Sequence, residues 1–236
     1  MNSSDSSHSV LGTQSSALRL GLFGGTFNPI HEGHLAVARR AREALGLDQI
    51  LFIPSGDPPH KTDRSLAPAA DRCEMVRLAI ASDPRCALSD IEIRRPGKSY
   101  TIDTIRQLRR DHGAGTQFYF LIGLDAFLDL PTWREPEALL HLCSFVVLSR
   151  PGTSFRALAS VPLLPTIPAQ ALADLDAGRL AVYETPIGAQ RLICLPVPPS
   201  DVSASEIRTC FQEGRSTANL LPPLVESYIL KHHLYS

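Results

Sequence analysis

Short apolar runs alternate along this chain with longer stretches in which apolar residues recur at helical spacing. The apolar runs read as buried strands and cover 18–23, 49–54, 118–122, 145–148 and 192–195. The stretches with helical spacing cover 35–45, 68–81, 100–112, 203–213 and 221–230. Strands that alternate with helices predict an α/β fold, with a doubly wound, mainly parallel sheet covered by helices on both faces.

Some segments carry weaker patterns. Residues 87–93 alternate enough to predict one more strand. In the first helix, the apolar face holds Leu35, Ala38, Ala41, Ala44 and Leu45, with Arg39, Arg40, Arg42 and Glu43 mostly on the other face. Residues 153–192 contain several prolines and only a weak helical pattern at 169–176. The serine-rich residues 1–17 predict a disordered extension, and 18–236 a single domain.

Composition narrows the possible partners. A net charge of −1 over 236 residues gives no reason to expect nucleic acid or an anionic membrane. No apolar run reaches the ~18 residues that a membrane span needs, and the start of the chain lacks the features of a secretory signal. Five scattered cysteines without a Cys-x-x-Cys pair fit a reducing compartment. We therefore expect a cytoplasmic protein; the oligomeric state stays open.

The most informative stretch is GGTFNPIHEGH at 24–34, between the first strand and the first helix. Gly24 and Gly25 allow the backbone to approach a bulky anion and to adopt dihedrals closed to other residues. His31 and His34 stand three apart in the first helical turn, so they share a face beside unpaired amides and the positive end of the helix dipole. This arrangement predicts a phosphate site. A metal site is the alternative, but no third ligand lies nearby, and the glycine pattern matches neither a P-loop nor a dinucleotide fingerprint.

A second motif, DVSASEIR, occupies 201–208. Ser203 and Glu206 have the spacing of a capping box at a helix start. Ser205 and Arg208 share a face of the same helix, and arginine is well suited to fork two phosphate oxygens. The motif therefore predicts a second anion site in addition to a helix cap.

Other candidates follow the strand ends. Gly123 and Asp125 come after the most apolar strand, where a carboxylate can accept hydrogen bonds from ribose hydroxyls, although Asp125 can also be only a helix cap. Trp133 can border a pocket there or fill the core. In the segment 55–67, His60 and Lys61 can bring positive charge over an anionic substrate, or lie on a solvated loop.

Seven segments together resemble the bacterial nicotinate-nucleotide adenylyltransferases, a family of the nucleotidylyltransferase superfamily. They are GGTFNPIHEGHL at 24–35, DPPHK at 57–61, SYTIDTI at 99–105, IGLDAFLDLPTW at 122–133, SRPG at 149–152, VSASEIR at 202–208 and LVESYIL at 224–230. Two positions depart from the family pattern. Asn28 replaces the more usual Asp, which keeps the turn-forming capacity but loses a charge, and Ala204 replaces a serine.

The resemblance implies a Rossmann-like fold and transfer of the adenylyl group of ATP to nicotinate mononucleotide, giving nicotinate adenine dinucleotide and pyrophosphate. It implies catalytic roles for His31, His34 and Arg208. The implied ATP-binding residues are Gly24, Gly25, Thr26, Phe27, Gly123, Asp125, Ser203 and Ser205. The implied residues of the nicotinate nucleotide site are His60, Lys61, Thr104 and Trp133. Mg²⁺, held mainly by the ATP phosphates, is the expected cofactor, with no metal site in the protein.

Alternatives remain. The acceptor could be phosphopantetheine or another small phosphate, or the donor could be CTP. A non-catalytic nucleotide-binding regulator is the alternative from another class, and a hydrolase with His31 and His34 as metal ligands is a further one.

Overall fold

A computed structural model describes residues 17–57, 66–149, 152–198 and 202–235. Within them, one seven-stranded sheet has the order β3-β2-β1-β4-β5-β7-β6. Its strands are β1 (Leu18–Gly25), β2 (Gln49–Pro54), β3 (Cys86–Leu88), β4 (Thr116–Gly123), β5 (Ser144–Leu148), β6 (Tyr183–Ile187) and β7 (Gln190–Leu195). Every neighbouring pair is parallel except β6 and β7. The mainly parallel sheet predicted from the sequence is confirmed.

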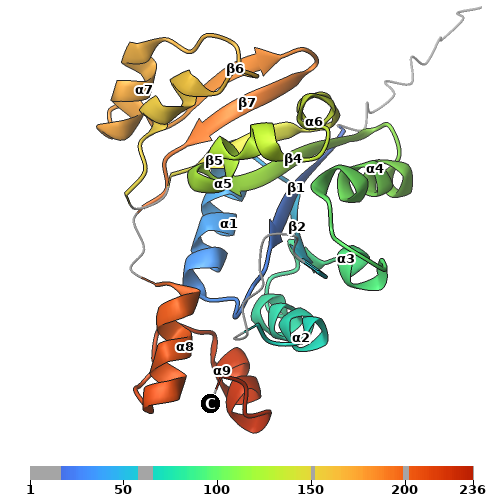
Figure 1. The fold of residues 1–236 in the computed structure, drawn as a ribbon, viewed down its shortest axis with the longest axis vertical. Coiled ribbons are helices and arrows are strands. Elements are labelled where there is room, and N and C mark those ends of the chain that lie inside the picture. Colours follow the sequence, from blue (N-terminus) through green and yellow to red (C-terminus); the bar gives the residue numbers. More distant parts are fainter. Residues whose placement is uncertain (1–16, 58–65, 150–151, 199–201, 236) are drawn as a thin grey trace, which may run out of the picture.

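Helices cover both faces of this sheet (Figure 1). One face is packed by α1 (Glu32–Leu45), α2 (Ala69–Ile80), α8 (Ala204–Glu213) and α9 (Pro223–Lys231). The other is packed by α3 (Ile91–Arg94), α4 (Thr101–His112), α5 (Leu124–Leu128), α6 (Pro136–Leu142) and α7 (Ala169–Asp176), with the 3₁₀ turns η1 (Leu130–Thr132) and η2 (Phe155–Ser160). Two buried apolar clusters, one on each face, form the core.

The order of the strands reverses at the centre of the sheet. β1 pairs with β2 on one side and with β4 on the other, so the chain turns outward in opposite directions from this pair. In open α/β sheets, ligands bind outside the carboxyl ends of the strands at such a switch point. The glycines that end β1 and β4 therefore mark the expected place of the site.

Residues 87–93 are not one strand, and that prediction is wrong. β3 ends at Leu88, and a single turn of helix, α3, follows. The Asp90 carbonyl accepts hydrogen bonds from the amides of Ile93 (3.0 Å) and Arg94 (3.0 Å), which closes this turn. Alternating apolar residues cannot distinguish a short edge strand from a strand joined to a helical turn.

The predicted faces of α1 also need correction. Ala38 and Ala41 are buried as expected, but Ala44 is exposed. Arg42, placed on the polar face, is only 4% exposed and pairs with Asp83 at 2.6 Å. A buried arginine can occupy a core-facing position when a carboxylate is within reach.

The weakly patterned segment 153–192 contributes η2, α7 and the antiparallel edge strand β6. The helix predicted at 169–176 is confirmed as α7. The predicted extension 1–17 lies outside the described residues except for Ala17. In the part of the chain that the structure describes, no helix is long and apolar enough to cross a membrane. All five cysteines are free thiols.

Candidate active site

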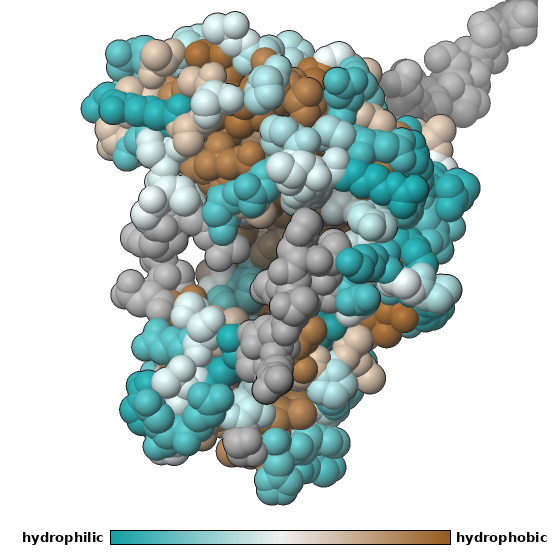
Figure 2. Space-filling view, in the orientation of Figure 1, coloured by the Kyte–Doolittle hydropathy of each residue, from teal (hydrophilic) through white to brown (hydrophobic). Residues whose placement is uncertain are grey.

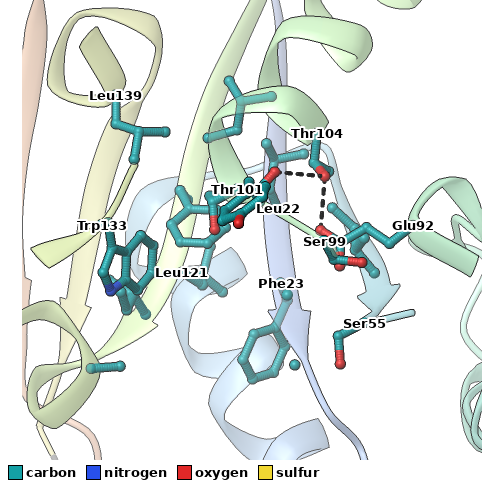
Figure 3. A pocket seen from close by; sticks show the side chains of 18 of the residues that line it. Leu22, Phe23, Ser55, Glu92, Ser99, Thr101, Thr104, Leu121, Trp133 and Leu139 are labelled. Atoms are coloured by element: carbon teal, nitrogen blue, oxygen red, sulfur yellow. Dashed lines mark hydrogen bonds between the residues drawn. The ribbon is translucent and has the colours of Figure 1, made fainter. Parts of the chain in front are cut away.

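A cavity of about 530 Å³ opens at the carboxyl ends of β1 and β4. Gly24, Gly25 and Gly123 line it. Figure 3 shows Thr101 and Thr104 of α4 and Trp133 of the turn after η1 around the same cavity. On the surface, Figure 2 shows the molecule hollowed on this face, between the part that carries α5–α7 and the part that carries α2, α8 and α9. The cavity thus coincides with the switch point of the sheet.

The glycine pair does not adopt the special dihedrals that the sequence allowed. Gly24 and Gly25 continue β1 and pair with β2, and neither has a positive φ. The left-handed backbone belongs to Phe27, with a φ of 48°. Its ring lies 3.0 Å from where a Cβ on Gly25 would stand, so Gly25 makes room for this ring. A buried aromatic residue in this sparsely populated region indicates a turn held in place by its surroundings.

The two histidines meet at the start of α1. His31 precedes the helix as its N-cap, and its ring centroid lies 3.8 Å from that of His34. The His31 backbone N–H donates to Nδ1 of His34 (3.3 Å). Because Nδ1 accepts, the neutral His34 ring carries its proton on Nε2. An imidazole N–H of this kind is the donor that a phosphate oxygen needs.

Arg208 joins the second motif to the first. Its Nη1 donates to the Asn28 carbonyl oxygen (2.9 Å), and its Nη2 donates to Oγ of Ser205 (3.3 Å). Ser203 caps α8 by accepting from the Glu206 amide (3.1 Å), so the capping role predicted for it is confirmed. Two segments 180 positions apart in the sequence therefore lie together beyond the carboxyl end of the central strand β1.

Asn28 has a structural role in this turn. Its Oδ1 accepts hydrogen bonds from the Ala67 amide (3.0 Å) and from the Tyr235 hydroxyl (2.7 Å). These donors use both lone pairs of the oxygen. The side chain at position 28 is therefore not placed as a metal ligand.

Arg72 is a residue of this site that sequence reasoning missed. It lies on α2 and is only 1% exposed. Its guanidinium donates to the carbonyl oxygens of Thr26 (2.7 Å), Gly56 (3.1 Å) and Ala67 (3.0 Å). Burial lowers the pKa of Arg72, but a guanidinium keeps its charge in proteins, so a positive charge lies behind the turn after β1. The signal was present: Arg72 stands three and four residues before the buried Met75 and Val76, on the inner face of the helix.

The wall formed by α4 and the turn after η1 carries both aromatic and polar side chains. Trp133 is half-buried against it, with its ring 6.5 Å from that of Phe120 in an edge arrangement. Thr104 also lines it, but its hydroxyl already donates to Glu92 (2.8 Å) and accepts from Arg95 (3.0 Å). Burial raises the pKa of the Glu92 carboxyl, which lines the same wall.

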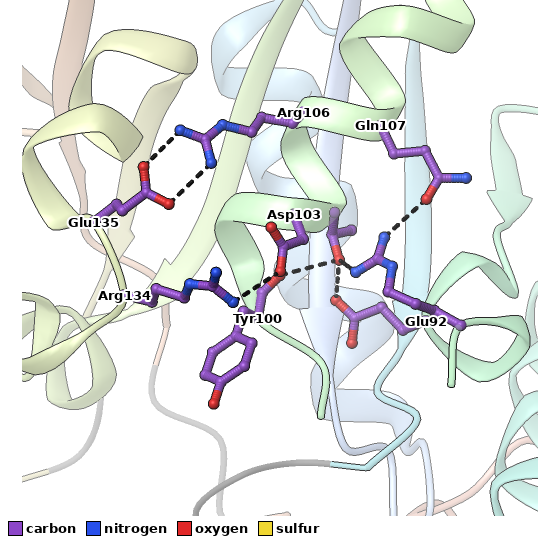
Figure 4. A network of polar contacts seen from close by, with 9 residues as sticks. Glu92, Tyr100, Asp103, Arg106, Gln107, Arg134 and Glu135 are labelled. Atoms are coloured by element: carbon purple, nitrogen blue, oxygen red, sulfur yellow. Dashed lines mark hydrogen bonds and ion pairs between the residues drawn. The ribbon is translucent and has the colours of Figure 1, made fainter. Parts of the chain in front are cut away.

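Charged side chains hold the Trp133 turn against α4 (Figure 4). Arg106 of α4 makes two hydrogen bonds to the Glu135 carboxylate, at 2.9 and 2.6 Å. Arg134 lies 3.5 Å from Asp103, with its guanidinium 5.0 Å from the centre of the Tyr100 ring. We call these five residues the latch.

Four further predicted residues have the following places. Gly123 lines the cavity and is the N-cap of α5, so Asp125 is not the cap that one interpretation made it. Asp125 lies in the first turn of α5, is exposed, and is not among the residues that line the cavity. His60 and Lys61 lie outside the described residues. Within the described ranges, no group of three or more His, Cys, Asp or Glu is arranged to hold a metal ion.

Known proteins match this chain over nearly its whole length. Residues 22–210 match the model of the Cytidylyltransferase-like family. A probable nicotinate-nucleotide adenylyltransferase of Geobacter metallireducens is 42% identical over 219 residues, which cover 93% of this chain and 99% of that protein. One of Pelobacter propionicus is 44% identical with the same coverage.

Solved structures agree on the fold. The Plasmodium falciparum nicotinic acid mononucleotide adenylyltransferase complexed with NaAD has a TM-score of 0.67 at 20% sequence identity, covering 92% of this chain and 97% of that one. The extent of the match and the identity to the curated relatives lead to one conclusion. The chain belongs to the nicotinate-nucleotide adenylyltransferases, within the cytidylyltransferase-like superfamily.

Proposed function

We propose that this protein transfers the adenylyl group of ATP to nicotinate mononucleotide, forming nicotinate adenine dinucleotide and pyrophosphate. The acceptor phosphate oxygen forms a bond to the α-phosphorus of ATP. The bond from that phosphorus to the oxygen bridging to the β-phosphate breaks, and its electron pair leaves with pyrophosphate. The observation that carries this proposal is the hydrogen bond from Arg208 to the turn that leads to His31 and His34. It holds the two motifs side by side, which supports a site in which donors from both motifs bind a single triphosphate.

The reaction needs no general base. A phosphate monoester is largely dianionic near neutral pH, because its second pKa is ~6. Catalysis then consists of aligning two polyanions and stabilising the charge that develops on the leaving pyrophosphate. We assign this stabilisation to His31, His34 and Arg208.

Backbone groups also contribute to the part of the site that we assign to the triphosphate, which we call the triphosphate end. Gly24, Gly25 and Thr26 line the cavity beside the start of α1, and Phe27 holds the turn. The start of α8, with Ser203 and Ser205, provides a second helix N-terminus, where the dipole favours an anion. Gly123 and Asp125 are proposed to face the adenosine ribose. Mg²⁺ would be held by ATP phosphate oxygens and would neutralise part of their charge.

The acceptor end supports a pyridine ring that carries a carboxylate. Trp133 offers an aromatic face at the cavity wall. α4 begins at Thr101, which lines the same cavity, and its N-cap residue, Tyr100, makes no side-chain cap hydrogen bond. Free amides at a helix start favour a carboxylate over a neutral amide, which favours nicotinate over nicotinamide. Thr104, His60 and Lys61 complete the proposed acceptor site.

An acceptor panel tests this function. The protein is incubated with ATP and Mg²⁺ and, in separate reactions, nicotinate mononucleotide, nicotinamide mononucleotide and phosphopantetheine, and pyrophosphate release is followed. We expect the highest kcat/KM with nicotinate mononucleotide, and no reaction when CTP replaces ATP. Faster turnover of phosphopantetheine, or ATP binding without pyrophosphate release from any acceptor, contradicts the proposal.

A further inference from the structure

The segment that follows α9 reaches back to the triphosphate end. Tyr235 packs its ring 6.5 Å from that of Phe211 on α8, and its hydroxyl donates to Oδ1 of Asn28 (2.7 Å). Its backbone has a φ of 70°, in the left-handed region that non-glycine residues rarely adopt. The tyrosine therefore holds a costly conformation in which its hydroxyl meets the turn between β1 and α1.

Asn28 connects this hydroxyl to the proposed phosphate donors. The same Oδ1 accepts from the Ala67 amide (3.0 Å), and the backbone carbonyl of Asn28 accepts from Arg208 (2.9 Å). Because a backbone amide can only donate, the atom facing it is the amide oxygen and not the nitrogen. Tyr235 must then donate its proton to that oxygen. A movement of Asn28 shifts both the turn and the carbonyl that orients Arg208.

We propose that Tyr235 is a positioning residue for ATP: its hydroxyl fixes Asn28, and through Asn28 it holds the phosphate-binding turn and the Arg208 guanidinium in the geometry that receives the triphosphate. This inference rests on the proposed function for the identity of the ligand. A turn that is ordered before binding does not have to lose conformational freedom when ATP arrives, so part of the ATP affinity depends on this contact.

The charges around the hydroxyl agree with a donor role. The guanidinium groups of Arg208 and Arg72 both lie close enough to favour the ionised form of Tyr235, yet burial outweighs them and raises its pKa above the usual range. The hydroxyl therefore keeps the proton that it donates to Asn28.

Another tyrosine offers a matched control. Tyr228 on α9 donates its hydroxyl to Oδ1 of Asp71 on α2 (2.8 Å), a contact that does not involve the turn. Tyr228→Phe and Tyr235→Phe each remove one oxygen and one hydrogen bond to a side-chain oxygen. Only Tyr235→Phe removes a hydrogen bond from Asn28.

The experiment compares both variants with the wild type. Calorimetric titration with ATP and Mg²⁺ gives the dissociation constant, steady-state kinetics give kcat and both KM values, and thermal unfolding gives Tm. We expect Tyr235→Phe to raise the dissociation constant and the KM for ATP by about three- to tenfold, the effect of losing one hydrogen bond. The KM for nicotinate mononucleotide stays unchanged. We expect both variants to lower Tm by similar amounts, because each loses one hydrogen bond. Tyr228→Phe leaves the affinity for ATP unchanged.

Two results overturn the inference. One is wild-type ATP affinity in Tyr235→Phe, whether or not its Tm falls. The other is an equal loss of ATP affinity in Tyr228→Phe, which indicates general loosening. A wild-type protein that makes no pyrophosphate from nicotinate mononucleotide refutes the proposed function instead, and the ATP titration still decides the role of Tyr235.

Discussion

The two parts of the proposed site, the turn after β1 and the latch, are held in different ways. At the turn, which is the proposed triphosphate end, Arg72 is 1% exposed and donates to three carbonyl oxygens, and Asn28 accepts from donors on three segments. At the acceptor end, the latch depends on charges at the surface, with Arg106 and Glu135 40% and 41% exposed. Buried hydrogen bonds to backbone are costly to break, whereas exposed ion pairs contribute little and are screened by salt. We therefore expect a rigid triphosphate end and an adaptable acceptor end.

The largest effect on catalysis should come from His34 at the rigid end. We expect His34→Ala to lower kcat by about 10²–10³-fold, as for loss of a donor to a developing charge, with a much smaller change in the KM for ATP. Steady-state kinetics test this, with His112→Ala at the far end of α4 as the control. Equal losses in ATP binding and turnover would contradict a transition-state role.

Arg72 should dominate stability at the same end. Arg72→Met leaves the carbonyl oxygens of Thr26, Gly56 and Ala67 without their donor, so we expect the free energy of unfolding to fall by about 3 kcal/mol. Urea denaturation measures it. The control is Arg77→Met on the same helix, whose ion pair with Glu74 is exposed and should matter little. If the two variants lose similar stability, buried hydrogen bonds and exposed ion pairs do not differ here as proposed.

Glu92, in the wall of the proposed acceptor site, should have a smaller effect on stability that depends on pH. Because burial raises its pKa above the ordinary 4.5, the folded protein binds this proton more tightly than the unfolded chain. Stability from this group is then present at low pH and is lost as pH rises through the folded pKa. Urea midpoints measured between acidic and neutral pH should show that the stability of Glu92→Gln rises relative to that of the wild type as pH increases. As a control, Glu43→Gln at an exposed position of α1 should show the same pH dependence of the urea midpoint as the wild type. A difference between Glu92→Gln and the wild type that does not change with pH would rule out the effect.

The smallest effect concerns the latch. Arg106→Gln removes both hydrogen bonds to Glu135. We expect a slight rise in the KM for the acceptor, an unchanged KM for ATP, and no remaining difference from the wild type in high salt, where the ion pair of the wild type is screened. Kinetics at low and high salt measure this. A large loss of ATP binding would mean that the two ends are not independent.

The hydrophobic pattern was enough to predict most of the sheet, because buried parallel strands are continuous apolar runs. β2, at Gln49–Pro54, matches its predicted bounds. The hydrophobic pattern failed where a charged side chain is buried and where an element is very short. Arg42 is charged yet buried beside Asp83, and α3 is a single turn.

The candidate site also contains residues that the sequence indicated and residues that it did not. The motifs around His34 and Arg208 were visible because glycines, histidines and a serine–arginine turn are local signals. Arg72 and Tyr235 were missed. The helix face of Arg72 indicated that it is buried, but the partners of both residues lie on other segments and only the folded chain brings them together. The roles of the predicted binding residues themselves stay predictions.

The bond between Tyr235 and Asn28 has a consequence for folding, because it joins positions 207 residues apart. Closing so long a loop costs entropy that only contacts made elsewhere can offset, so such distant pairs form after the local ones. We expect the sheet and its helices to assemble first and the nucleotide site to mature last. A refolding chain would then regain its circular dichroism before it regains its affinity for ATP.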